Sequence, residues 1–469
     1  MSFFPKETYV ARRRKLAESI GKGTVLLLGN DNVGMNYTDN HYPFRQDSTF
    51  LYFFGINKPG LAGTINTETG EAKIFGDDLS IDDIVWTGPM PNLSELATCA
   101  GVTVTAPSNK LVEEIAKCQI QNQPIHYIPQ YRHRNLIKTA DLLDIPINQV
   151  NLNASVTLIK GIVALRSIKS EEEIVEIEKA VNLSLDMHEA AIAMARPGVN
   201  ENTIAAKIRQ VAEAAGGTLS FPTIATIRGE ILHNHYTGNT LQEGDLLLLD
   251  AGAEVRSGYA GDLSSTIPVS GQFTARQREV YDVVYSAHLA AMDTLKPGTE
   301  FTETHRAACL KIAEGMNSLG LMKGDPAEAV AQGAHALFFQ CGTGHMMGLD
   351  VHDMENLGEQ YVGYTDTKLK STQFGLKSLR LGKALEPGFV VTVEPGIYFI
   401  PELIDRWKAE KKFEDFINYS EVEKYKDFGG IRNEEDVLIT KDGSRTLGRK
   451  KTQSADELES LMASITETV

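Results

Sequence analysis

The sequence predicts a mixed α/β (α+β) protein with a smaller N-terminal domain and a larger C-terminal one. Short apolar runs alternate with amphipathic segments through the first part of the chain. A long helical pattern then begins at Ser170, and beyond it similar helix ends and strand patterns occur twice in the same order. A chain of 469 residues is long enough for two or three domains. We therefore expect an N-terminal domain over residues 1–160 and a larger C-terminal domain over residues 161–469.

The composition is that of an ordinary globular protein, with 42% hydrophobic and 23% charged residues. A formal net charge of −16 argues against binding to nucleic acid or to an acidic membrane surface. No stretch is apolar for long enough to cross a membrane, and the first residues lack the pattern of a signal peptide. The four cysteines form no CxxC pair, which is typical of a reducing compartment. We expect a cytoplasmic protein.

Strand and helix patterns alternate in the N-terminal part. Apolar runs predict strands, and amphipathic segments predict helices. We expect helices over residues 8–20, 92–100 and 110–117, and strands over 24–28, 50–54, 63–66 and 72–75. The segment Tyr42–Phe54 is polar and then aromatic, and we interpret it as a structural loop leading into a core strand rather than as part of an active-site or subunit wall.

The larger part contains two related halves. Ser170 and Glu173 form a capping-box pattern that begins a long helix, and Pro197-Gly198 ends it. Pro297-Gly298 ends another helix, and a further helical stretch follows in each case, over 201–215 and 303–319. The segments 243–252 and 387–396 then share the same spacing of glycine, acid and glycine. This repetition indicates an ancient duplication.

A predicted hairpin carries the first candidate site. Leu246–Leu249 lead into Asp250, and Asp262 precedes a second apolar run, Leu263–Ile267. Apolar runs separated by glycine and turn residues predict paired strands. Because a buried carboxylate is costly unless it is paired, two aspartates on neighbouring strands would repel each other unless a cation lay between them.

Five side chains of metal-binding types accompany the predicted strands: Asp250, Asp262, His345, Glu394 and Glu434. Four carboxylates and one imidazole balance two divalent cations in formal charge. Mainly oxygen ligands suit Mn²⁺, Zn²⁺, Fe²⁺ or Co²⁺. Two such ions would convert a bridging water into a nucleophile and act as a Lewis acid for a carbonyl group.

The ordered motifs Asp-Ala-Gly, Gly-Asp-Leu-Ser, Gly-His, Val-Glu-Pro-Gly and Gly-Ile-Arg-x-Glu resemble those of the pita-bread metallopeptidases. That family includes methionine aminopeptidase, aminopeptidase P and prolidase. Residues 42–48 (Tyr-Pro-Phe-Arg-Gln-Asp-Ser) resemble the creatinase-like N-terminal domain that aminopeptidase P and prolidase share. The resemblance covers nearly the whole chain. It implies a small creatinase-like α/β domain followed by a duplicated pita-bread metallopeptidase domain.

The resemblance also implies two divalent metal ions per subunit, Mn²⁺ first, with Zn²⁺, Co²⁺ or Fe²⁺ as alternatives. Asp250 would bind one ion with both oxygens, and Asp262 would bridge the two ions. His345 and Glu394 would complete the first ion's shell, and Glu434 would bridge.

Other residues match positions that contact substrate in the family. His352 matches a histidine at the substrate carbonyl or transition state, and Arg432 matches an arginine near the bridging site. His233 matches another substrate-contacting histidine by its spacing from Asp250. His235 is a rival because the residues after it also fit, and we prefer His233.

The segments 375–400 and 428–432 resemble prolidase of the eukaryotic kind. In that type the arginine matching Arg380 grips the C-terminal carboxylate of an Xaa-Pro dipeptide, because a guanidinium group matches a carboxylate. We expect hydrolysis of the bond before proline in such dipeptides by attack of a metal-bridging hydroxide. The alternative is an aminopeptidase P that releases the N-terminal residue of longer Xaa-Pro peptides. A creatinase-like enzyme or a binding module without peptidase activity is a remoter alternative.

One position departs from the family pattern. Cys341 stands where prolidase and aminopeptidase P usually have a histidine. A cysteine cannot act as an imidazolium donor, so we expect an effect on rate and specificity while the reaction type is kept. The resemblance further implies a homodimer or homotetramer.

Overall fold

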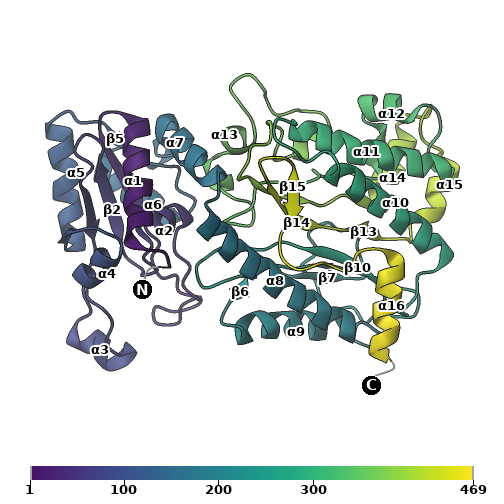
Figure 1. Ribbon diagram of the computed structural model, residues 1–469, viewed down its shortest axis with the longest axis horizontal. Coiled ribbons are helices and arrows are strands. Elements are labelled where there is room, and N and C mark those ends of the chain that lie inside the picture. The colour runs from purple at the N-terminus through teal and green to yellow at the C-terminus, as the bar shows by residue number, and fades with distance from the viewer. Residues whose placement is uncertain (1–2, 467–469) are drawn as a thin grey trace. The chain divides into compact units, whose positions relative to one another are not determined.

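The computed structural model describes residues 3–466, which divide into two compact units (Figure 1). The first unit runs to Arg166 and also includes Met354–Tyr361, and the second comprises Ser167–Asp353 and the chain from Val362 onward. We propose that these units are the two domains. A boundary after residue 160 would fall inside helix α7 (Val156–Ser167), so we place it at the end of that helix.

The first unit is built on one mixed sheet with the strand order β4-β3-β2-β1-β5. Strand β1 runs antiparallel to β2 and parallel to β5, and all its residues are buried, so both faces of the sheet are covered. Leu26 and Leu28 pack on one face with Ile115. The elements of this unit are α1 (Lys6–Ile20), β1 (Thr24–Leu28), α2 (Ser48–Phe54), β2 (Ala62–Asn66), β3 (Ala72–Phe75), α3 (Ile81–Thr87), α4 (Leu93–Cys99), β4 (Val104–Ala106), α5 (Leu111–Ile120), β5 (Ile125–His126), α6 (His133–Leu143) and α7.

The strand expected over residues 50–54 is wrong, because this segment is helix α2. The Asp47 side chain accepts a hydrogen bond from the backbone N–H of Phe50 and caps the helix. Gly55 ends it in the left-handed conformation, with φ at 64°. Every residue of α2 is buried, so the aromatic run that favours a strand is equally suited to a helix with apolar surroundings on all sides.

The second unit contains two long helix pairs and two three-stranded sheets. The expected capping box is confirmed at the start of α8, where the Ser170 hydroxyl accepts from the Glu173 N–H and the Glu173 carboxylate accepts from the Ser170 N–H. The main helices are α8 (Glu171–Met194), α9 (Glu201–Ala214), α10 (Ala275–Met292), α11 (Phe301–Ser318), α12 (Pro326–Gln332), α14 (Pro401–Ala409), α15 (Tyr419–Val422) and α16 (Ala455–Thr466). The strands are β6 (Thr218–Leu219), β7 (Ile224–Thr226), β8 (Leu246–Asp250), β9 (Ala253–Glu254), β10 (Ser264–Pro268), β11 (Val390–Val393), β12 (Gly396–Tyr398), β13 (Gly430–Arg432), β14 (Glu435–Ile439) and β15 (Ser444–Thr446).

The two halves of this unit repeat the same backbone contacts. The N–H of Gly198, beyond α8, donates to the Leu241 carbonyl at 2.8 Å. The N–H of Gly298, beyond α10, donates to the Leu385 carbonyl at 2.8 Å. One half contributes the sheet β10-β8-β7 and the other the sheet β11-β14-β15 (Figure 1). The shared pattern is what a duplicated sequence produces.

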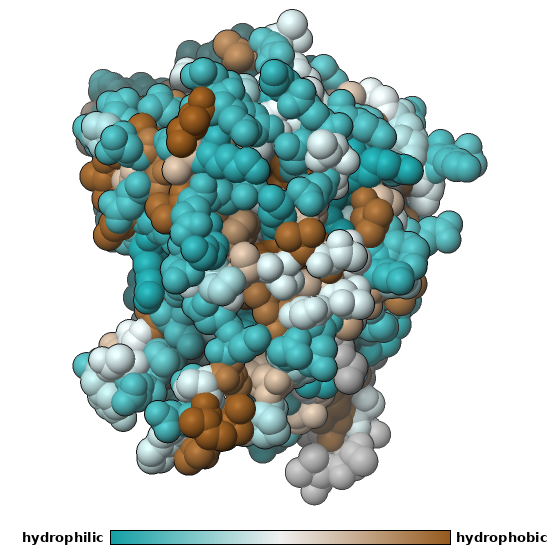
Figure 2. Space-filling view, turned by 90° about the vertical axis from the view of Figure 1, so that its left-hand side faces the viewer, coloured by the Kyte–Doolittle hydropathy of each residue, from teal (hydrophilic) through white to brown (hydrophobic). Residues whose placement is uncertain are grey.

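The surface is mainly hydrophilic on the face shown in Figure 2, with separate hydrophobic patches. Exposed apolar residues of α3 include Ile81, Val85 and Trp86. Among residues 3–466, none of the helices is both long and apolar enough to cross a lipid bilayer.

Candidate metal centre

The hairpin of β8 and β10 positions the two aspartates. The strands pair antiparallel with Ser264 opposite Asp250, which confirms the predicted hairpin. Asp250 is the last residue of β8, whereas Asp262 lies in the loop before β10. At Gly252 an added Cβ would lie 1.9 Å from the carbonyl oxygen of Gly261, so only glycine lets the two segments approach this closely.

A second close backbone approach positions His345 beside Glu394. The His345 N–H donates to the Thr392 hydroxyl at 3.1 Å, and the Glu394 N–H donates to the carbonyl of Thr343 at 2.7 Å. An added Cβ at Gly344 would lie 2.0 Å from the carbonyl oxygen of Thr392, so the glycine is required here. Glu394 comes directly after β11, and its carboxylate faces the imidazole of His345.

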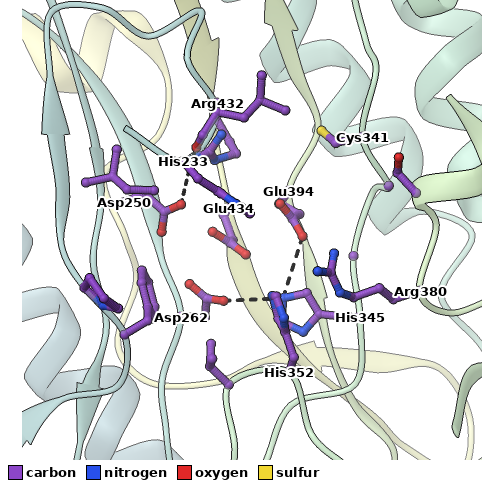
Figure 3. A pocket seen from close by; sticks show the side chains of 18 of the residues that line it. His233, Asp250, Asp262, Cys341, His345, His352, Arg380, Glu394, Arg432 and Glu434 are labelled. Atoms are coloured by element: carbon purple, nitrogen blue, oxygen red, sulfur yellow. Dashed lines mark hydrogen bonds and ion pairs between the residues drawn. The ribbon is translucent and has the colours of Figure 1, made fainter. Parts of the chain in front are cut away.

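The five expected ligands surround one space in the second unit (Figure 3). His345 Nε2 lies 3.4 Å from Asp262 Oδ2 and 3.7 Å from Glu394 Oε1. Ligand atoms of Asp262, His345 and Glu434 all lie within 4.8 Å of one another. The cavity that they line has a volume of about 430 Å³. The structure therefore brings together side chains that are distant in sequence.

Burial makes this cluster electrostatically costly. Burial and the charge of Asp250 raise the pKa of Asp262 to about 8. Burial also raises the pKa of Glu394 to about 7. The pKa of Glu434 lies well above its usual range, because of burial and then the neighbouring charge of Asp262. The carboxylates cannot all be ionised at neutral pH unless cations compensate their charge.

The donor set fits divalent metal ions. Asp250 Oδ1 and Asp262 Oδ1 are buried and have no hydrogen-bond partner among the described residues. His345 Nδ1 lies 3.0 Å from the Met346 carbonyl, so this nitrogen carries the proton and Nε2 offers its lone pair to the carboxylate cluster. Unpartnered carboxylate oxygens around a neutral imidazole nitrogen are suitable ligands for Mn²⁺, Zn²⁺, Co²⁺ or Fe²⁺.

Arg432 fixes one side of the centre. Its Nη2 lies 2.6 Å from Asp250 Oδ2, its Nη1 donates to the Tyr398 hydroxyl at 2.9 Å, and its Nε donates to the Ser264 hydroxyl at 3.0 Å. The Ser264 hydroxyl in turn donates to Glu434 Oε2 at 2.8 Å. One guanidinium group thus orients two of the expected ligands.

The expected substrate-contacting residues line the same cavity. The rings of His352 and His345 meet edge to face, with centroids 4.3 Å apart. Burial, and then the charge of Arg432, lowers the pKa of His233. The Arg380 side chain points into the space beside Glu394 (Figure 3). His235 also lines the cavity, so the structure does not separate the two rival histidines by position alone.

Three further residues of the centre were not named from the sequence. Buried Lys451 donates to Asn433 Oδ1 at 2.6 Å and to the Glu434 carbonyl at 2.9 Å, so it holds the backbone at Glu434. Asp436 accepts from the Asp262 N–H at 2.9 Å. Tyr398 binds Arg432 and also lies 3.9 Å from the Cys341 sulfur. Tyr398 and Asp436 come shortly after two of the strand motifs, which could have indicated them. No motif lies near Lys451.

Comparison with known proteins identifies the family. Residues 175–441 match metallopeptidase family M24, and residues 9–126 match the N-terminal domain of aminopeptidase P. The chain belongs to metallopeptidase family M24. The two matches together define the prolidase and aminopeptidase P branch of that family, and the protein is therefore a metallopeptidase with divalent metal ions.

Two relatives and one solved structure show the extent of the similarity. The chain is 29% identical to human Xaa-Pro dipeptidase over 98% of this chain and 94% of the relative. It is 29% identical to Xaa-Pro aminopeptidase of Escherichia coli strain K12 over 98% and 99%. A histidine-to-alanine variant of Escherichia coli aminopeptidase P superposes with a TM-score of 0.81 at 26% identity and covers 99% of both chains. The expected pita-bread fold is confirmed.

Proposed function

We propose that this protein hydrolyses the peptide bond before proline, with Xaa-Pro dipeptides as its main substrates. The observation that carries the proposal is the place of Arg380, which lines the same cavity as the five expected metal ligands. An arginine at that position offers a fork of N–H donors to a free carboxylate. In a dipeptide the carboxylate is one residue from the scissile bond, so both can lie in one small cavity.

The metal centre would be formed by Asp250, Asp262, His345, Glu394 and Glu434, with two Mn²⁺ ions as the preferred occupants. When bound, such ions supply a water nucleophile at neutral pH and a Lewis acid for the scissile carbonyl. The unpartnered oxygens of Asp250 and Asp262 support this assignment. The proposal includes a homodimer or homotetramer, as the family resemblance implies.

The histidines and Arg432 would act on the substrate and its surroundings. His352, whose ring packs against that of His345, would donate a hydrogen bond to the carbonyl oxygen as it gains charge. His233 would contact the substrate from the side of Asp250 and Arg432. Arg432 holds Asp250 in orientation through their 2.6 Å ion pair.

Aminopeptidase P activity on longer Xaa-Pro peptides is the second candidate. The aminopeptidase from Escherichia coli and the human dipeptidase are both 29% identical to this chain. The match covers 99% of the aminopeptidase and 94% of the dipeptidase. In that case the carboxylate would lie farther from the cleaved bond, and Arg380 would contribute little to binding. Substrate length therefore separates the two candidates.

The test compares an Xaa-Pro dipeptide with an Xaa-Pro-Xaa tripeptide in wild type and in Arg380→Ala. We expect the variant to lose about 10- to 100-fold in kcat/KM on the dipeptide, which corresponds to the loss of a charge-assisted hydrogen bond, and to change little on the tripeptide. Lys377→Ala is the matched control, because Lys377 is an exposed cation in the same segment that does not line the cavity. Equal cleavage of both substrates, unaffected by Arg380→Ala, would favour the aminopeptidase.

A further inference from the structure

A second cavity in the catalytic unit contains metal-binding side chains that the proposed reaction does not use. It has a volume of about 250 Å³, and His305, Cys309 and His335 line it. Their exposed fractions are 1%, 0% and 2%. One potential ligand atom from each lies within 4.8 Å of the other two. The exposed residues Glu303 and Arg306 line the same cavity, which gives an ion a path from solvent.

The local structure explains why these side chains meet. His305 and Cys309 are four residues apart on α11, so they project from one face of the helix. His335 comes from the short 3-10 helix η3 (Ala334–Leu337). All three lie outside the five-residue metal centre, and the sequence motifs of the family do not include them.

His335 is the observation that points to a ligand. Both of its ring nitrogens are buried and have no hydrogen-bond partner among residues 3–466. A buried polar group that lacks a partner costs about 1–3 kcal/mol, and such groups are rare in folded proteins. A cation bound in the cavity would satisfy one of these nitrogens.

His305 is already oriented as a ligand. Its Nδ1 lies 2.8 Å from the Thr343 hydroxyl, and its Nε2 lies 3.3 Å from Cys309 Sγ. When Nδ1 donates to Thr343, Nε2 presents its lone pair beside the sulfur, as metal-bound histidines do. Zinc bonds of about 2.0 Å to nitrogen and 2.3 Å to sulfur place tetrahedral ligands roughly 3.5 Å apart, close to this separation.

The two imidazoles are already in the protonation state that binds a metal, whereas the Cys309 thiol must lose its proton on binding. Burial lowers the pKa of His305 to about 3 and that of His335 to about 4, so both imidazoles are neutral at pH 7. Burial raises the pKa of the Cys309 thiol above its usual range. When a metal binds, the S–H proton passes to solvent and a sulfur–metal bond forms in its place.

We propose that His305, Cys309 and His335 form a separate site for a thiophilic divalent cation, Zn²⁺ by ligand type, with water from the cavity as the fourth ligand. The site would brace the catalytic loop. Thr343, which bonds His305, also accepts the Glu394 N–H at 2.7 Å and belongs to the loop that carries His345.

Cobalt substitution tests the site independently of activity. Co²⁺ bound to a thiolate absorbs in the near ultraviolet through charge transfer from sulfur, whereas carboxylate and imidazole ligands give no such band. Metal-free protein titrated with Co²⁺ should develop the band. Added Zn²⁺ should displace the bound Co²⁺ and remove the band. Cys309→Ser should abolish the band, and His335→Ala should weaken Co²⁺ binding at this site by at least about 10-fold.

Two control variants separate this site from the five-residue centre. Cys341→Ser removes the thiol that lines the other cavity and should keep the band. Glu434→Gln should lower the total metal content by its effect on that centre while the band persists. Should His335→Ala fail to fold, His335→Gln serves in its place. Absence of the band in wild type, its survival in Cys309→Ser, or its loss in Cys341→Ser would overturn the proposal.

Discussion

At the scale of single residues, the centre is a balance between buried charge and the groups that compensate it. Asp250 is held by Arg432 at 2.6 Å, while Asp262 and Glu434 have raised pKa values because they are buried beside other carboxylates. Side chains with this environment occur where a cation is bound or a proton is held. The proposed substrate-contacting residues line the same cavity, and His233 is the one that needs a direct test.

We predict that His233→Ala lowers kcat/KM on an Xaa-Pro dipeptide by about 10- to 100-fold, as expected for loss of a hydrogen bond to a charged group. His235→Ala should change kcat/KM much less, because the spacing from Asp250 favours His233 as the substrate contact. Steady-state kinetics on the two variants measure the difference. The opposite order of effects would assign the role to His235.

The motifs predict the five ligand types because each has a characteristic neighbour, such as the Val-Glu-Pro-Gly around Glu394. Lys451 could not be found in this way. Its contacts with Asn433 and Glu434 depend on how the C-terminal segment returns to β13 and β14, which local sequence does not encode. The rival histidines 233 and 235 lie in one loop and line one cavity, so position in the cavity alone cannot rank them.

At the scale of elements, helices with explicit caps are the most predictable. The capping box of Ser170 and Glu173 marks α8 in the sequence and is present in the structure. Helix α2 is mispredicted because its aromatic residues favour strands. A fully buried segment can be a strand or a helix, and here Asp47 and Gly55 stabilise the two ends of a helix. The polar cap at Asp47 and the glycine at Gly55 therefore determine that this segment is a helix. A prediction from the apolar pattern misses them, because it gives most weight to the aromatic residues.

Helix α16 offers a test of this kind of cap. The Glu457 N–H donates to the Ser454 hydroxyl at 3.2 Å, and the Glu457 carboxylate accepts from the Ser454 N–H at 3.3 Å. A hydrogen bond from Lys450, and then those from the backbone, lower the pKa of Glu457 from 4.5 to about 2. The ionised form therefore stabilises the folded state fully above pH 4.5, and this contribution is lost as the pH falls towards 2.

We predict that Glu457→Gln lowers the free energy of unfolding at pH 7 by roughly 0.5 kcal/mol, since the side chain is partly exposed and its charge is screened. The difference in thermal midpoint between wild type and variant should shrink as the pH falls below 4.5. Thermal unfolding at several pH values gives this difference directly. A gap that stays constant below pH 4.5 would show that the charge of Glu457 does not stabilise the helix.

At the scale of the whole molecule, both related halves of the second unit contribute to the proposed metal centre. The two halves supply the same helix ends and backbone bonds, and each contributes a proposed acidic ligand at a strand end, Asp250 in one and Glu394 in the other. The repeated glycine and acid spacing makes this arrangement predictable from sequence. The positions of Glu434 and His345 beside Asp250 and Glu394 depend on tertiary packing. Only the family resemblance predicted that these four side chains lie together.

The central claim is that a metal centre held by these acids hydrolyses Xaa-Pro bonds, and metal reconstitution tests it most directly. Protein stripped by a chelator is titrated with Mn²⁺ while hydrolysis of an Xaa-Pro dipeptide is followed in wild type and in Asp262→Asn. We predict no hydrolysis without metal, activity that rises with added Mn²⁺, and a loss of more than about 100-fold in the variant, beyond the effect of an outer-sphere change. Full activity in the stripped protein, or an Asp262→Asn variant as active as wild type, would contradict the account.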